Sequence, residues 1–184
     1  MKIKTLFKIV FTLCITMLSA QNSLQIPSVS ASIGEKTKIN IDLTNSDPII
    51  SVEFTLVVPK GLIVYDKESI LKQDRKGEDH VLFTNLDKDG NYHFMVFSYT
   101  NKVFKGNRGT LIEIPIEIPI TYKDGQSFDI LLKNVIVSST KIQDVGSNHQ
   151  GGKLLIKKDF SPDLEVSEVT TLGSEALPDK KLTA

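Results

Sequence analysis

The sequence predicts an all-β fold, a nine-stranded antiparallel jelly-roll β-sandwich, and three observations lead to it. From Ser23 to Lys157, apolar and polar residues alternate in short stretches, which is the period-two pattern of strands. Gly, Asn, Asp or Pro bounds each stretch, as expected of turns. Nine such stretches follow one another without a convincing helix, with room for only one helical turn within Asp66–Arg75. Many short strands separated by turn signals favour two packed antiparallel sheets.

The clearest strand runs from Thr110 to Thr121. Its even-numbered positions from 112 to 120 carry five isoleucines, whereas the odd-numbered positions from 113 to 119 alternate between glutamate and proline. The isoleucine row is therefore expected in the core: Ile112, Ile114, Ile116, Ile118 and Ile120. Pro115 and Pro119 share one parity, so the missing N–H groups fall on one side of the strand. We expect this strand at a sheet edge.

The other strands are predicted from the same alternation. They are Lys38–Leu43, Ile50–Val58, Leu62–Tyr65, His80–Leu86, Tyr92–Tyr99, Ser127–Val137 and Lys153–Lys157, together with an N-terminal stretch around Pro27. The apolar parity of that stretch shifts across Pro27, which predicts a bulge or a strand that changes sheets. Asp87–Asn91 resembles part of a calcium loop but lacks the distal glutamate, so we expect a hairpin turn with Gly90 at positive φ.

The two ends of the chain differ from this pattern. In residues 1–20, three lysines precede a ten-residue apolar run that closes on Ser19 and Ala20, as in a secretory signal peptide. The apolar run is too short to span a membrane, so we expect no membrane span after cleavage. We expect the protein to be secreted, extracellular or at the cell surface, and a location in the periplasm stays open. Residues 21–158 are the predicted domain. Residues 159–184 hold too few apolar residues for a core and are interpreted as a linker or the start of a truncated further domain.

Charge and cysteine content exclude several classes of function. Cleavage would remove three lysines and no acidic residue, leaving 19 basic against 22 acidic residues and a net charge of −3. That balance argues against a nucleic-acid partner. Cys14, the single cysteine, would leave with the leader, so no disulfide, thiol nucleophile or thiolate metal site is expected.

Patterns of known catalytic sites are also missing from the sequence. There is no G-x-S-x-G, H-E-x-x-H or G-x-x-x-x-G-K pattern. The histidines, His80, His93 and His149, are scattered, and none has a nucleophile or second ligand at a chelating interval. We therefore predict that the protein is not an enzyme and needs no cofactor or metal.

Several segments together resemble one family, the bacterial cohesin-like domains, which are jelly-roll sandwiches related to a group of carbohydrate-binding modules. The segments are SASIGEKTKINIDL (30–43), ISVEFTLVVPKGLIVY (50–65), NYHFMVFSYTNKVFKGNRG (91–109), the strand from Thr110 and ILLKNVIVSS (130–139). They match the family in order and cover almost all of the predicted domain. The matching positions are core parities and turn glycines, so the resemblance implies the fold more strongly than the activity.

Cohesins hold a dockerin module of another secreted protein through one face of the sandwich, so the resemblance implies a non-catalytic binding module of a polysaccharide-degrading system. Its partner would be a dockerin-like module or another secreted protein. Matching positions place the implied partner-binding residues on the outward sides of two strands: Ser51, Glu53, Thr55 and Val57, and His93, Met95, Phe97 and Tyr99. Apart from acidic Glu53, the polar contacts of well-studied cohesins have no strict match, so dockerin specificity does not transfer.

Two alternative functions stay open at this stage. Direct binding of a polysaccharide would need aromatic platforms, yet the chain has no tryptophan and its four tyrosines fall on different strands or loops. A structural spacer of a cell-surface protein would fit the change of composition after Lys158. The sequence does not decide between a protein and a glycan partner.

Overall fold

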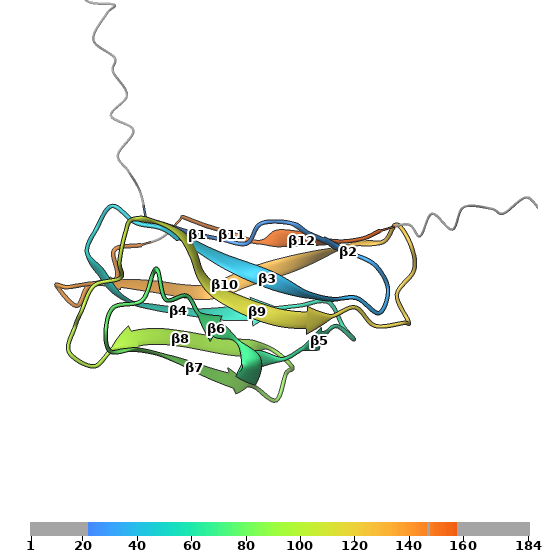
Figure 1. The fold of residues 1–184 in the computed structure, drawn as a ribbon, viewed down its shortest axis with the longest axis horizontal. Coiled ribbons are helices and arrows are strands. Elements are labelled where there is room, and N and C mark those ends of the chain that lie inside the picture. The colour runs from blue at the N-terminus through green and yellow to red at the C-terminus, as the bar shows by residue number, and fades with distance from the viewer. Residues whose placement is uncertain (1–21, 147, 158–184) are drawn as a thin grey trace, which may run out of the picture.

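The computed structural model describes residues 22–146 and 148–157, which form two β-sheets packed face to face (Figure 1). The first sheet contains, in spatial order, β11 (Asn148–Gln150), β1 (Ser23–Gln25), β3 (Lys36–Thr44), β9 (Arg108–Glu117) and β5 (Ile63–Val64), with β6 (Ile70–Leu71) also paired to β9. The second contains β2 (Val29–Ala31), β12 (Gly152–Ile156), β10 (Ser127–Ser139), β4 (Ile49–Val57), β8 (Tyr92–Ser98) and β7 (His80–Leu86). The all-β sandwich is confirmed. Within the described residues, no helix is both long and apolar enough to span a bilayer.

Each of the nine predicted stretches contains a strand. The N-terminal stretch is divided at Pro27 into β1 in the first sheet and β2 in the second, so the predicted change of sheets is confirmed. The chain makes a second crossing at Gly151, between β11 and β12, and β11 lies outside the predicted Lys153–Lys157 strand. The two crossing segments pair in parallel, β1 with β11 and β2 with β12, while the other pairs are antiparallel. A side chain at Gly151 would collide with the backbone oxygen of Ile130, so glycine is required where the chain passes between the sheets.

The predicted edge position of the Thr110–Thr121 strand is wrong. β9 lies between β3 on one side and β5 and β6 on the other. The second side is divided between two short strands: β5 pairs with Ile116 and Glu117, and β6 with Ile112 and Glu113. Pro115 lies in the gap between them, where its missing N–H leaves no ladder bond unmade, and its carbonyl accepts the Tyr65 N–H at 3.0 Å.

The isoleucine row of β9 is buried as predicted, with one exception. Ile112, Ile114, Ile116 and Ile118 are fully buried, whereas Ile120 is 84% exposed. β9 ends at Glu117, and a turn closed by the Tyr122 N–H on the Pro119 carbonyl turns Ile120 outward. Tyr122 takes a buried position beyond that turn.

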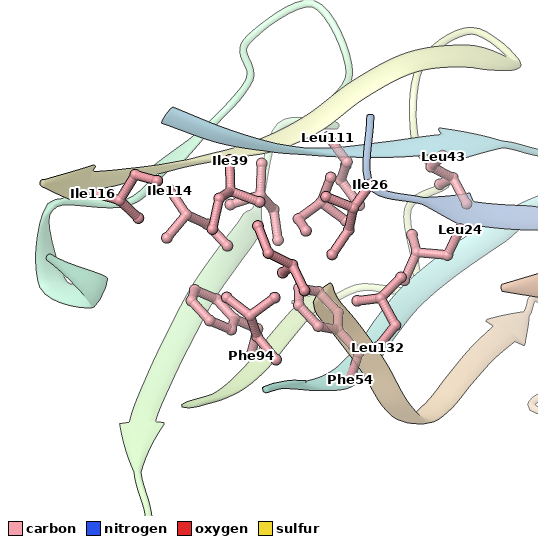
Figure 2. Packing of buried hydrophobic residues seen from close by; sticks show 14 of the residues in the cluster. Leu24, Ile26, Ile39, Leu43, Phe54, Phe94, Leu111, Ile114, Ile116 and Leu132 are labelled. Atoms are coloured by element: carbon pink, nitrogen blue, oxygen red, sulfur yellow. The ribbon is translucent and has the colours of Figure 1, made fainter. Parts of the chain in front are cut away.

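The core lies between the inner faces of the two sheets. Figure 2 shows Phe54 of β4 and Phe94 of β8 opposite the isoleucines of β3 and β9. The two phenylalanine rings are stacked with centroids 5.2 Å apart, and both are fully buried. This pair fixes the parity of β4 and β8, since alternate residues of a strand point to opposite faces.

The connecting segments adopt the predicted conformations. Asp66–Glu68 forms the helical turn, as a single 3-10 turn between β5 and β6. Asp87–Asn91 is the hairpin turn between β7 and β8, with Gly90 at φ 83°. One oxygen of the Asp87 carboxylate accepts the N–H groups of both Asp89 and Asn91, which closes the turn.

Candidate binding face

The outer face of the second sheet carries the predicted partner-binding residues, and we call it the candidate face. It consists of the outward side chains of β10, β4, β8 and β7. The strand registers align them in three rows across the sheet: Ser138, Ser51, Phe97 and Val81; then Ile136, Glu53, Met95 and Phe83; then Lys133, Thr55, His93 and Asn85. The outward parity predicted for β4 and β8 therefore agrees with the structure.

The predicted residues differ in accessibility. Met95 is 39% exposed and Tyr99, just after β8, is 66% exposed. Ser51, Glu53, Val57, His93 and Phe97 are half-buried, and Thr55 is buried. The structure thus brings these residues together on one face, while their role in binding stays a prediction.

An aromatic cluster occupies the β7 side of this face. The rings of Phe83 and Phe97 are stacked with centroids 5.6 Å apart, and Tyr99 meets Phe97 edge-on at 5.1 Å. Phe83 is 52% exposed although it lies in the middle of a strand. The exposed ring faces favour contact with another molecule, because aromatic side chains contribute large contact areas at interfaces.

The loop that carries Tyr99 is held by one carboxylate. Asp79 accepts the Ser98 hydroxyl at 2.6 Å, and the Thr100 N–H and hydroxyl at 2.7 and 2.8 Å. These bonds, the Ser98 hydroxyl first, lower the pKa of Asp79 to about 2. Because Asp79 holds the residues on both sides of Tyr99, it fixes the position of this ring beside Phe97.

A chain of polar side chains crosses the opposite end of the face. The Asn134 amide donates to the Thr55 hydroxyl at 3.3 Å, Thr55 contacts His93 Nδ1 at 3.2 Å, and His93 Nε2 lies 3.0 Å from Asp87. The Asn91 N–H, and then His93, hold the pKa of Asp87 well below its ordinary value. Asn134 has φ 49° at a register shift in β10, where a bulge turns its side chain toward Thr55.

Sequence reasoning missed three apolar side chains of the candidate face. Phe83, Ile136 and Leu131 are all more than two fifths exposed, yet they occur in stretches whose outward side was not assigned. For Phe83 a signal existed in the alternation of β7, since Val81, Phe83 and Asn85 share one parity, and the structure pairs them with the outward residues Phe97, Met95 and His93. Ile136 gave no such signal, because the bulge at Asn134 shifts the parity within β10.

A hollow opens beside Phe83 on the candidate face. Its lining includes Glu53, Asn85, His93, Met95 and the exposed ring of Phe83. Its walls are mostly apolar, and Glu53, His93 and Asn85 supply polar groups to the lining. The hollow could receive one side chain of another molecule.

The remaining histidines lie away from this face. His80 is buried, where its Nδ1 accepts the Gly77 N–H at 2.8 Å and its ring stacks on Phe104. His149 is exposed on β11. In the described parts of the chain, no three His, Cys, Asp or Glu side chains are grouped to hold a metal ion.

The fold is that of cohesin modules. A type I cohesin in complex with a dockerin, from Clostridium thermocellum, superimposes with a TM-score of 0.64 at 17% identity, covering 74% of this chain and 99% of that one. A non-cellulosomal cohesin from the hyperthermophilic archaeon Archaeoglobus fulgidus gives 0.61 at 16% identity, covering 76% and 93%. A type III cohesin module of a cell-surface anchoring scaffoldin of Ruminococcus flavefaciens gives 0.60 at 12% identity, covering 76% and 89%.

Sequence comparison adds no closer relative. Neither a protein-family model nor a curated protein matches the chain. The cohesin-like fold that the resemblance implies is confirmed by the structural comparison, which at these identities shows the fold alone.

Proposed function

We propose that this domain is an exported, non-catalytic module that holds a protein partner through the candidate face. The observation that carries the proposal is the group of exposed apolar side chains on an otherwise regular sheet face: Phe83, Met95, Tyr99, Leu131 and Ile136. Exposed apolar groups gathered on one face mark interaction sites more often than isolated ones do.

The arrangement of the candidate face fits a protein partner. Aromatic anchors lie at one end of the face, and hydrogen-bonding groups of β4 and β10 lie at the other, so the face combines the two kinds of group that a protein-binding patch uses. Since several of the superimposed cohesins are in complexes with dockerins, a dockerin-like module is the partner that we propose first.

The proposal is tested by replacing the anchors. Tyr99→Ala and Phe97→Ala should each weaken binding of the partner by about 2 kcal/mol or more, which is the loss expected at an interface anchor. Candidate partners are a panel of calcium-loaded dockerin modules and proteins captured from the secreted fraction, with affinities measured by calorimetry on purified pairs. Ile70→Ala is the matched control, because Ile70 is 50% exposed but lies on β6 of the first sheet.

Three outcomes would each contradict a part of the proposal. Unchanged affinity in both aromatic variants would place the partner on another surface. Retardation by soluble polysaccharides in gels, abolished by Tyr99→Ala, together with no protein ligand, would favour carbohydrate binding. Absence of the protein from the secreted fraction of its own cells would contradict export.

A further inference from the structure

One carboxylate at the centre of the candidate face has no partner within the described residues. Glu53 is half-buried on β4, and residues 22–146 and 148–157 provide it with neither a hydrogen bond nor an ion pair. Glu113 of the first sheet differs, because Lys38 and Lys72 reach its two oxygens at 2.6 and 2.9 Å. Glu53 thus keeps its full capacity to accept hydrogen bonds from another molecule.

The neighbours of Glu53 in its row across the sheet are all apolar. Ile136 lies opposite it on β10 and Met95 on β8, with Phe83 next in line on β7. Directly opposed side chains have Cβ atoms roughly 5 Å apart, so Ile136 and Met95 flank the carboxylate closely. A charge beside apolar groups attracts a counter-ion more strongly than a charge surrounded by water.

The hollow gives this carboxylate an accessible approach. Glu53 lies on its lining together with Asn85, whose side-chain carbonyl is a further acceptor, and with the exposed ring of Phe83. An occupant that suits this lining has an apolar stem, several hydrogen-bond donors and a positive charge.

We infer that the hollow receives an arginine side chain of the protein partner, with its guanidinium on Glu53. A guanidinium presents five donors in a plane, binds a carboxylate through two parallel bonds and stacks on aromatic rings such as Phe83. It is also more weakly hydrated than the lysine ammonium, so it loses less on entering a mostly apolar hollow. This inference rests on the proposed function and adds the chemistry of one partner residue.

The test uses a small probe and needs no identified partner. The isotope-labelled protein is titrated with N-acetyl-arginine methylamide while its NMR spectrum is followed. We expect saturable shifts of the Met95 methyl signal and of the Glu53 and Phe83 amide signals, with a dissociation constant on the order of tens of millimolar. The lysine analogue should bind several-fold more weakly, and the uncharged norleucine analogue should not shift these signals.

Two variants test whether the Glu53 carboxylate, and not its surroundings, causes the shifts of the NMR signals. Glu53→Gln keeps the size of the side chain and should abolish the shifts, whereas Glu113→Gln on the first sheet should leave them unchanged. Shifts that persist in Glu53→Gln, equal shifts with norleucine, or no shifts around Glu53 in the unmodified protein would each overturn the inference. Because the probe requires no partner, these results are distinguishable from a failure of the aromatic variants to affect partner binding.

Discussion

The two outer faces of the sandwich have the same alternation of residues along their strands but carry different kinds of side chain. On the first sheet, Lys38 and Lys72 pair with Glu113, and Lys36 lies 3.7 Å from Glu117. On the second sheet, the outward residues include exposed Phe83 and Met95 and the unpaired Glu53. The first face pairs these charges with its own side chains, whereas the second leaves an aromatic cluster and one carboxylate available to another molecule.

This contrast reflects the different requirements that folding places on the inner and outer faces of the sheets. Both inner faces meet one core, so both need apolar residues at alternate positions. The outer faces are free of that requirement, and a solvated face is best completed by paired charges. Exposed aromatic rings on such a face lower solubility, so their presence is consistent with a binding role.

The largest expected effect is a difference in the free energy of unfolding between substitutions on the two sides of β8. Phe94→Ala should reduce the free energy of unfolding by about 3 to 5 kcal/mol, because the ring is fully buried and stacked on Phe54. Its neighbour Met95 points outward, so Met95→Ala should cost less than about 1 kcal/mol. Urea denaturation of both variants measures the contrast. Similar losses at the two positions would mean that the candidate face is not an outer face.

The bulge in β10 gives a second test of how the candidate face is built. Asn134 has φ 49°, a region that β-branched side chains avoid, so Asn134→Val should destabilise by about 1 to 2 kcal/mol. Asn134→Gly relieves the backbone while removing the bond to Thr55, and should therefore cost less than Asn134→Val. Equal losses in the two variants would attribute the effect to the lost hydrogen bond and not to the backbone.

The sequence predicted the strands well because burial imposes strict periodicity on them. The isoleucine row of β9 and the change of sheets at Pro27 follow from parity alone. The neighbours of β9 could not be predicted, because Pro115 indicates a missing donor but not that the partner strand is interrupted there. Pairing depends on contacts between residues far apart in the chain, which local pattern does not contain.

The candidate face could be predicted only in part for related reasons. The resemblance to cohesins implied that His93, Met95 and Phe97 lie on the outward side, next to Glu53 and Thr55, and the strand register agrees. It could not show that Phe83 stacks on Phe97, since that contact depends on the register between β7 and β8. Nor could it show that Glu53 stays unpaired, because ion pairs on a sheet depend on which strands are adjacent.

A third prediction concerns the loop that holds the aromatic cluster in place. The pKa of Asp79 is lowered from 3.8 to about 2, so its bonds stabilise the fold above pH 4 and this contribution is lost as pH falls toward 2. Asp79→Asn should lower Tm at pH 6, and the difference from the unmodified protein should shrink steadily between pH 4 and pH 2. Thermal unfolding monitored by circular dichroism over this range measures it. A difference that is constant with pH would exclude the carboxylate as the cause.

The smallest expected effect belongs to the paired face. Lys38 is exposed and shares Glu113 with Lys72, so Lys38→Ala should cost less than about 1 kcal/mol, because Lys72 still neutralises the carboxylate. In about 1 M NaCl, where the screening length falls to about 3 Å, most of that loss should disappear. On the candidate face, Glu53→Gln removes a charge that has no partner among the described residues, so stability should stay the same or rise slightly. Urea denaturation at low and high salt compares the two variants. A clear loss of stability in Glu53→Gln would show that this carboxylate supports the fold. The contrast between the first sheet, whose charges pair with one another, and the candidate face, where Glu53 is available to a partner, would then be wrong at Glu53.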